Sequence, residues 1–158
     1  MKRSTHWIIL GLLLMTGLAQ ADFLAVGSRL EPFSLQDQHA VEQTVDEKTR
    51  LILFSRDMEG GKLLKEALSE VEAETLALRG AVYVADISGM PKLVARLFAL
   101  PSMRKRPYPM LLDRDGSTTA SLPDVEGSAT LIFLEQLEIV RIEHVETAED
   151  VRESLETQ

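Results

Sequence analysis

Three side chains that could do acid–base or electrostatic chemistry follow directly on an apolar run. Asp57 and Glu59 supply carboxylates, and Lys62 supplies an amine three residues after Glu59. Gly60 and Gly61 lie between them and could offer backbone N–H groups to an anion, although two glycines fall far short of a phosphate-binding motif. We expect Glu59 at a helix N-terminus, where it acts either as a capping group or as part of a site that still binds something.

A second group is the only dense basic run outside the N-terminal segment. Arg104, Lys105 and Arg106 stand among three prolines, so we expect a stiff loop. Such a loop is either solvated and salt-bridged or a contact for an acidic partner or ligand, and it could lie near Asp57 or Glu59. The candidate binding face therefore comprises Asp57, Met58, Glu59, Gly60, Gly61, Lys62, Arg104, Lys105 and Arg106.

Composition excludes several classes of chemistry. The chain has no cysteine, so it forms no disulfide, thiolate nucleophile, Cys-ligated zinc site or iron–sulfur cluster. It carries 17 Lys and Arg against 25 Asp and Glu, a formal net charge of −8, and nucleic acid is not an expected partner because phosphate contact needs a basic surface. His39 and His144 are far apart in the sequence, so no metal site is predicted, and the methionines are expected to fill gaps in the core rather than bind copper.

The N-terminus has the features of an export signal. Lys2 and Arg3 precede an apolar run from residue 7 to residue 18, and Ala19-Gln20-Ala21 has the small-x-small pattern of a cleavage site. The alternative is an uncleaved anchor, but the apolar run is too short to span a bilayer. We therefore predict a signal peptide over residues 1–21, cleavage after Ala21, a single domain over 22–158 and, in a Gram-negative bacterium, a periplasmic protein without a stable membrane span.

The remaining pattern alternates short apolar runs with amphipathic segments. Strands are expected at 33–35, 41–45, 51–54, 81–85, 108–112, 130–134 and 139–145. Helices are expected over 62–78, from Pro91 onward with an apolar stripe of Leu93, Val94, Leu97 and Phe98, and after Thr147, with Ala148, Val151 and Leu155 facing inward. Continuous apolar strands must be covered on both faces, so we predict an α/β fold with a mixed central sheet, helices on both faces and an N-terminal hairpin.

Several short motifs, in this order, resemble a known family. They are Val26-Gly27 with Pro32-Phe33-Ser34-Leu35, the strand 51–54, Tyr108-Pro109-Met110-Leu111-Leu112-Asp113, and the segment 128–134. This order is similar to the thioredoxin fold, and in particular to its peroxiredoxin-like branch, the alkyl hydroperoxide reductase and thiol-specific antioxidant type. Small periplasmic proteins of the YtfJ type are the nearest subgroup. The resemblance implies a thioredoxin-like domain over nearly all of 22–158.

The departures from that family concern its chemistry. Glu59-Gly60-Gly61-Lys62 stands where thioredoxins have Cys-x-x-Cys, and the loop lacks the Thr and Cys that peroxiredoxins require. The arginine that peroxiredoxins bring from a later strand corresponds to Ser128 or Ala129. Thiol–disulfide exchange and cysteine peroxidase activity both need a thiolate, so this chain is expected to perform neither.

Two functions remain. The first is an exported, redox-inactive thioredoxin-like protein that serves as a binding or assembly module for an unknown periplasmic protein or small ligand. The alternative is a cysteine-independent enzyme with Glu59 or Asp57 as acid or base and Lys62 or Arg106 as electrophile. A flavin-type oxidoreductase lacks support, because no Gly-x-Gly-x-x-Gly motif follows a strand, and no cofactor is predicted.

Overall fold

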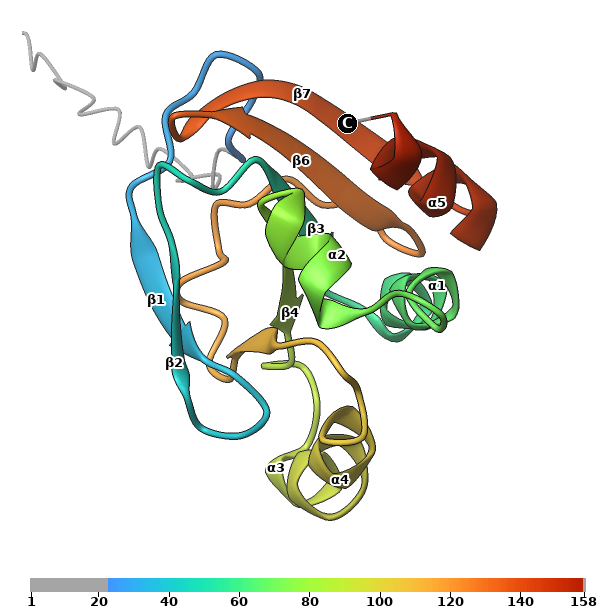
Figure 1. Ribbon diagram of the computed structural model, residues 1–158. Helices are drawn as coiled ribbons and strands as arrows, with labels where there is room; N and C mark the ends of the chain where they lie inside the picture. Colours follow the sequence, from blue (N-terminus) through green and yellow to red (C-terminus); the bar gives the residue numbers. More distant parts are fainter. Residues whose placement is uncertain (1–22, 158) are drawn as a thin grey trace, which may run out of the picture.

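Five strands form the central sheet of the computed structural model, which describes residues 23–157. Their order is β5-β4-β3-β6-β7, and a separate hairpin precedes them (Figure 1). The hairpin strands are β1 (Phe33–Gln36) and β2 (Glu42–Val45), and the sheet strands are β3 (Leu51–Ser55), β4 (Ala81–Asp86), β5 (Met110–Asp113), β6 (Ala129–Glu135) and β7 (Glu138–Val145). β3, β4 and β5 are parallel, whereas β6 and β7 are antiparallel, so the predicted mixed sheet and N-terminal hairpin are confirmed.

The central strand β3 is buried at every position because both faces of the sheet are covered. Alternate side chains of a strand point to opposite faces. Leu51 and Leu53 therefore join one hydrophobic cluster, and Ile52 and Phe54 join the other. This explains why the sequence of β3 is a continuous apolar run rather than an alternating one.

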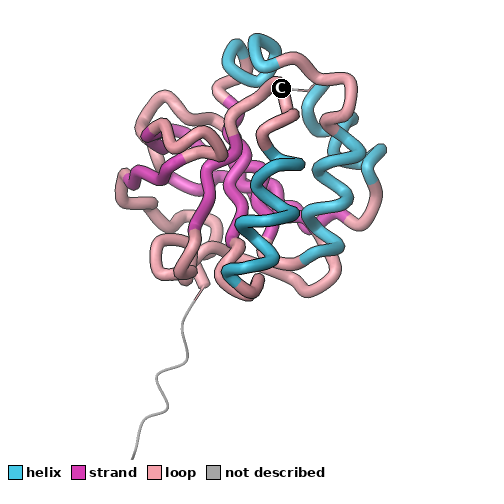
Figure 2. The backbone as a smooth tube through the Cα atoms, turned by 90° about the horizontal axis from the view of Figure 1, so that it is seen from below, coloured by secondary structure: helices cyan, strands magenta, loops and turns pink. Residues whose placement is uncertain are grey.

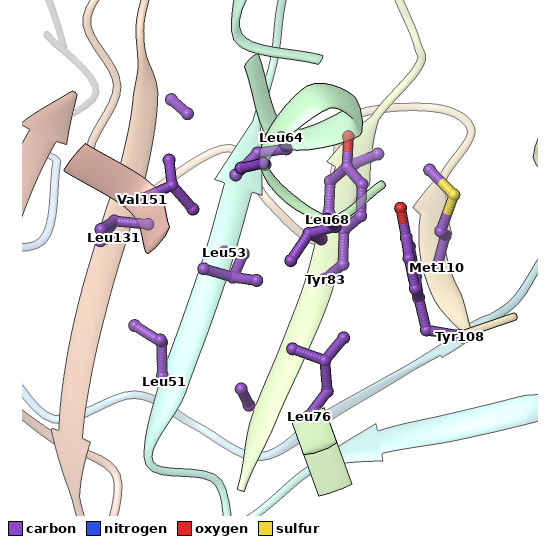
Figure 3. Packing of buried hydrophobic residues seen from close by; sticks show 14 of the residues in the cluster. Leu51, Leu53, Leu64, Leu68, Leu76, Tyr83, Tyr108, Met110, Leu131 and Val151 are labelled. Atoms are coloured by element: carbon purple, nitrogen blue, oxygen red, sulfur yellow. The ribbon is translucent and has the colours of Figure 1, made fainter. Parts of the chain in front are cut away.

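Helices cover the first of these faces. They are α1 (Met58–Ala67), α2 (Ala73–Leu78) and α5 (Ala148–Glu156), and in Figure 2 the helices gather on one side of the strands. Leu64 of α1, Leu76 of α2 and Val151 of α5 all pack in the cluster with Leu51 and Leu53 (Figure 3). As predicted, the Thr147 hydroxyl caps α5 by accepting from the Asp150 amide at 3.2 Å.

The second face is covered by the hairpin and by loops. Val45 of β2 packs there with Leu30 and Leu122, and the helical residues of the two clusters all lie on the first face, which corrects the expectation of helices on both. The physical reason is the handedness of parallel connections, which are right-handed in nearly all proteins. The connections from β3 to β4 and from β4 to β5 step in the same direction across the sheet, so both place their helices on one side.

The helix expected over 62–78 is two helices, and the first begins earlier, at Met58. A continuous helix of that length would extend about 25 Å, whereas strands of five or six residues extend only about 17–20 Å. The break at residues 68–72 allows α2 to turn back against β4. Buried Leu68 forms the end of α1, and Gly80, with a positive φ of 60°, completes the turn into β4.

The helix expected after Pro91 forms, but its apolar stripe faces outward. It consists of α3 (Lys92–Val94), a π-helical turn η1 (Ala95–Ala99) and α4 (Leu100–Met103). Leu93, Val94, Leu97 and Phe98 are all exposed, Phe98 by 70%. Pro101 has no N–H to donate and crowds the carbonyl four residues earlier, so an irregular turn directly before it is the expected response.

A buried glutamine ties the hairpin to the edge of the sheet. Gln38 donates to the Tyr108 carbonyl at 2.8 Å and accepts from the Met110 amide at 2.8 Å, which are the backbone groups that a neighbouring strand would use. Its own backbone carbonyl accepts from Arg104 Nε at 3.0 Å. The edge of the sheet at β5 is thereby closed at these groups, and the chain that leads into β5 is fixed in place.

Asp37, beside it, organises the hairpin turn. The side chain is only 4% exposed, and its carboxylate accepts hydrogen bonds from the backbone amides of His39 and Val41 and from Gln43 Nε2. Burial by itself would raise the pKa of Asp37, but these three donors outweigh it and lower the pKa below its usual value. The ionised carboxylate therefore stabilises the fold.

We predict that Asp37→Asn lowers the free energy of unfolding at pH 7 by about 1–3 kcal/mol, because buried donors lose a charged acceptor. The folded pKa lies below the unfolded value of about 3.9, so the stabilisation is complete above that pH and is lost as the pH falls through the folded pKa. Urea unfolding from pH 7 to pH 2.5 should show the difference from wild type shrinking below about pH 4. Exposed Glu42→Gln is the control; a difference that stays constant with pH would contradict the prediction.

Candidate functional site

A cavity of about 600 Å³ opens over the first face of the sheet. It lies between α1 and the α3–η1–α4 helix, where the helical cover of β4 and β5 is incomplete. We refer to it as the β4–β5 cavity. Its lining comprises Ser55, Arg56, Asp57, Met58, Gly61, Lys62, Lys65, Tyr83, Ala85, Asp86, Ile87, Gly89, Met90, Pro91, Val94, Ala99, Ser102, Met103, Arg106, Tyr108 and Met110.

The walls of the β4–β5 cavity are largely apolar and rich in methionine. Met58, Met90, Met103 and Met110 all line it. Met110 is buried, as expected of a core residue, but Met58 is 71% exposed and does not fill a core gap. Methionine side chains are flexible and polarizable, so walls of this kind adapt to ligands of different shape.

Two tyrosines form the polar part of the floor. Figure 3 shows Tyr83 and Tyr108 side by side with their hydroxyl oxygens pointing the same way, and their ring centroids lie 6.5 Å apart. Tyr83 Oη lies 3.2 Å from Ser55 Oγ. Burial raises the pKa of Tyr83 to about 12, and burial also raises the pKa of Tyr108, while the charge of Arg106 acts in the opposite direction on both. Both hydroxyls are therefore neutral hydrogen-bonding groups at ordinary pH.

The N-terminus of α1 is capped by Asp57 and not, as expected, by Glu59. Asp57 Oδ1 accepts from the Gly60 amide at 2.8 Å, and Oδ2 accepts from the Gly127 amide at 2.6 Å. A capping carboxylate must belong to the residue before the first helical turn, and Glu59 already lies within that turn. Both oxygens of Asp57 thus hold backbone groups together, which leaves this side chain poorly placed to act as an acid or base.

Glu59 and Lys62 form a surface ion pair at the rim. Lys62 Nζ lies 2.7 Å from Glu59 Oε1, one helical turn apart, and both side chains are more than half exposed. Exposed pairs of this kind contribute little to stability. They also lack the desolvated surroundings that are typical of catalytic groups.

The basic run divides between two environments. Arg106 lines the β4–β5 cavity, as do Asp57 and Lys62. Arg104 instead extends toward the hairpin turn, and Lys105 is exposed and outside the cavity lining. Glu59 and Gly60 also lie outside that lining, as Arg104 and Lys105 do. Five of the nine residues of the predicted face therefore line the cavity.

Arg56 is a site residue that the sequence did not indicate. Its guanidinium donates to the Thr119 carbonyl at 2.6 Å, lies 3.3 Å from Asp86 Oδ2 and 3.8 Å from Asp124 Oδ2, and stacks over the Phe54 ring. Burial raises the pKa of Asp124 in spite of this cation. The arginine therefore holds β4 to the loop before β6 rather than projecting freely into the cavity.

Neither a metal centre nor a membrane-spanning element is evident within residues 23–157. No three His, Cys, Asp or Glu side chains gather there as ligands of a metal ion would. No helix in this part of the chain combines the length and apolar character needed to cross a membrane. The predicted signal peptide, residues 1–21, lies outside the described residues.

The two adjacent glycines of α1 have opposite surroundings. A Cβ on Gly60 would lie 2.2 Å from the Ser128 carbonyl oxygen, so only glycine allows α1 to approach the start of β6 this closely. A Cβ on Gly61 would meet Ser55 Oγ at 3.9 Å and Tyr83 Oη at 4.0 Å, which is ordinary contact. Gly60 therefore allows a close contact between backbones, whereas a small side chain would fit at Gly61 on the cavity side of α1.

We predict opposite effects of the same substitution at these two positions. Gly60→Ala should lower the free energy of unfolding by about 1–3 kcal/mol through overpacking against backbone. Gly61→Ala should raise it by up to about 1 kcal/mol, because alanine is the better helix former and finds room. Urea denaturation of both variants measures the difference; effects of the same sign would contradict the prediction.

Comparison with known proteins agrees with this architecture. No family model and no curated protein sequence matches the chain. Solved structures do: a peroxidoxin from Mycobacterium tuberculosis matches with a TM-score of 0.53 at 16% identity, over 84% of this chain and 96% of its own. The thioredoxin domain of a thiol-disulfide oxidoreductase from Bacteroides vulgatus matches with a TM-score of 0.54 at 15% identity, over 85% and 97%.

A peroxiredoxin-like protein from Aquifex aeolicus matches with a TM-score of 0.53 at 11% identity, over 85% of this chain and 88% of its own. Identities this low establish the fold and nothing about activity. Each of these matches extends over 84% or 85% of this chain. The chain therefore has the thioredoxin-like fold that thioredoxins and peroxiredoxins share, built without a single cysteine.

Proposed function

We propose that this protein is an exported, redox-inactive binding module of the thioredoxin-like fold and that its ligand or partner occupies the β4–β5 cavity. The single observation that carries the proposal is a large, mostly apolar cavity on a chain that has no cysteine. Its volume of about 600 Å³ falls in the range of sites for small molecules, about 300–1,000 Å³.

The exposed apolar stripe of α3 and η1 adds support. Val94 belongs both to this stripe and to the cavity lining, so the apolar surface continues from the cavity onto the outside of the helix. Exposed apolar surface is costly in water and commonly marks a place where another molecule binds. A binding role accounts for the stripe, whereas a purely structural role for this helix would turn it toward the core.

The enzyme alternative has less support from the same residues. Asp57 is occupied by two backbone amides, and Glu59 is exposed and paired with Lys62. Arg106 is the one cation of that proposed group that lines the cavity without an ion-pair partner among the described residues. The thiol-disulfide oxidoreductase activity named for the Bacteroides vulgatus protein does not transfer, since thiol chemistry needs a thiolate.

Protein-observed NMR with a mixed library of small molecules and short peptides tests the binding role. We expect hits that perturb the amides of cavity-lining residues and that disappear in Gly61→Leu, because a side chain at position 61 projects between Ser55 and Tyr83. Glu66→Leu places the same side chain on an exposed position of the same helix, outside the cavity lining, and should retain the hits. A library with no hit, or hits that survive in Gly61→Leu, would overturn the proposal.

Export is the second part of the proposal, and it has its own test. Expression of the full chain in a Gram-negative host should yield a periplasmic product whose N-terminal residue is Asp22. Cleavage removes Trp7, the only tryptophan, so the mature protein should show tyrosine fluorescence without a tryptophan contribution. Mass spectrometry of the purified product decides the matter, and a product that retains residues 1–21 would refute cleavage.

A further inference from the structure

We propose that the β4–β5 cavity binds a small apolar molecule that ends in a carboxylate. The carboxylate lies against Arg106 and the hydroxyl group of Tyr108, and the apolar part lies among Met58, Met90 and Met103. This inference rests on the proposed binding function and adds to it the chemical class of the ligand.

The Tyr108 hydroxyl is a buried polar group without a partner. Tyr108 is 1% exposed, and its hydroxyl forms no hydrogen bond with residues 23–157, whereas the Tyr83 hydroxyl has Ser55. No side-chain oxygen or nitrogen that is fully closed off from solvent lacks a partner in this part of the chain. The small exposed area of Tyr108 therefore includes its hydroxyl oxygen, which is available to a molecule in the cavity that Tyr108 lines.

Positive charge dominates the lining, and part of it is uncompensated. Four cations line the cavity against two carboxylates, Asp57 and Asp86, both of which are occupied by hydrogen bonds from their neighbours. Lys62 is paired with Glu59, but neither Lys65 nor Arg106 forms an ion pair within the described residues. An anion would therefore be attracted to this cavity, and the planar fork of arginine suits a carboxylate.

The rest of the cavity lining is mostly apolar and suits an apolar part of the ligand. Apart from Ser102, the segment from Gly89 to Met103 lines the cavity with apolar residues only. A ligand with both an anionic end and an apolar chain satisfies the two kinds of lining at once. A highly charged ligand such as a nucleotide would leave the methionines facing a polar group, which costs free energy.

A small molecule fits this place better than a peptide strand. Extended peptides commonly bind a β-sheet by adding a strand to an open edge, which requires free backbone groups. At the β5 edge, the Tyr108 carbonyl and the Met110 amide are already bonded to Gln38. A peptide strand would therefore find this end of the β5 edge occupied, whereas a small molecule needs only the cavity itself.

The test compares octanoate, 1-octanol and octylamine, which share one apolar chain and differ in the end group, by NMR titration of the mature protein. Octanoate should bind at least about tenfold more tightly than either analogue, as expected for one charge-assisted hydrogen bond in a desolvated site. Arg106→Gln should weaken the binding of octanoate by about the same factor and leave the affinity for 1-octanol unchanged. Lys105→Gln removes the neighbouring exposed charge and is the matched control, with no expected effect. Tyr108→Phe should weaken octanoate severalfold.

The outcomes separate this inference from the binding function. If the protein bound octanoate, 1-octanol and octylamine with equal affinity, the carboxylate assignment would be overturned. An equal loss of octanoate affinity in Arg106→Gln and Lys105→Gln would also overturn it. If octanoate fails to bind while library hits in the same cavity persist, the inference is wrong and the binding function stands. An apolar tetrapeptide with a free C-terminus that binds more tightly than both octanoate and its amidated form would assign the cavity to peptide ends instead.

Discussion

The close approach of the first turn of α1 to the chain before β6 is the constraint on which the rest of the site depends. Gly60 lies against the Ser128 carbonyl with no room for a side chain, and Asp57 joins the same two segments by accepting from the Gly60 and Gly127 amides. These contacts hold the N-terminal half of α1 near β3 and β6. Because α1 is held there, it leaves β4 and β5 partly uncovered, and the β4–β5 cavity occupies the space that remains.

The polar groups in and around the cavity are carboxylates, amines, hydroxyls and guanidinium groups, and none of them is a thiol. The residues at 59 and 62 form an exposed ion pair at the rim, where a pair of cysteines would stand in a thioredoxin according to the resemblance of the sequence. Deeper in, burial keeps the Tyr83 and Tyr108 hydroxyls neutral, and Arg106 supplies the charge. The scaffold thus places apolar walls, hydrogen-bonding groups and positive charge around one cavity. Gln38 contributes from the other side, because it fixes the chain between Tyr108 and Met110 and so sets the floor.

Local patterns in the sequence predicted much of the fold and brought together several residues that share a cavity. The strands from β3 to β7 follow from continuous or alternating apolar runs, and the Thr147 cap of α5 follows from residue types three positions apart. Five residues of the candidate face, Asp57, Met58, Gly61, Lys62 and Arg106, line one cavity, and their role in binding stays a prediction. The sequence did not indicate that the stripe of α3 and η1 is exposed, because its spacing is the same whether the stripe meets the core or the solvent.

By itself the sequence determined the absence of cysteine, the acidic charge and the order of the strands, because each depends on residue type or local spacing alone. The export signal, which depends on the same kind of local pattern, stays a prediction. Only the tertiary structure decided that Asp57 and not Glu59 is the cap, that Gln38 occupies the edge of β5, and that Tyr83, Tyr108 and Arg106 share one cavity. The occupied edge of β5 and the shared cavity depend on contacts between residues that are distant in the chain; Gln38 and Tyr108, for example, are 70 positions apart. Such contacts arise from the packing of whole elements, which no short stretch of residues encodes.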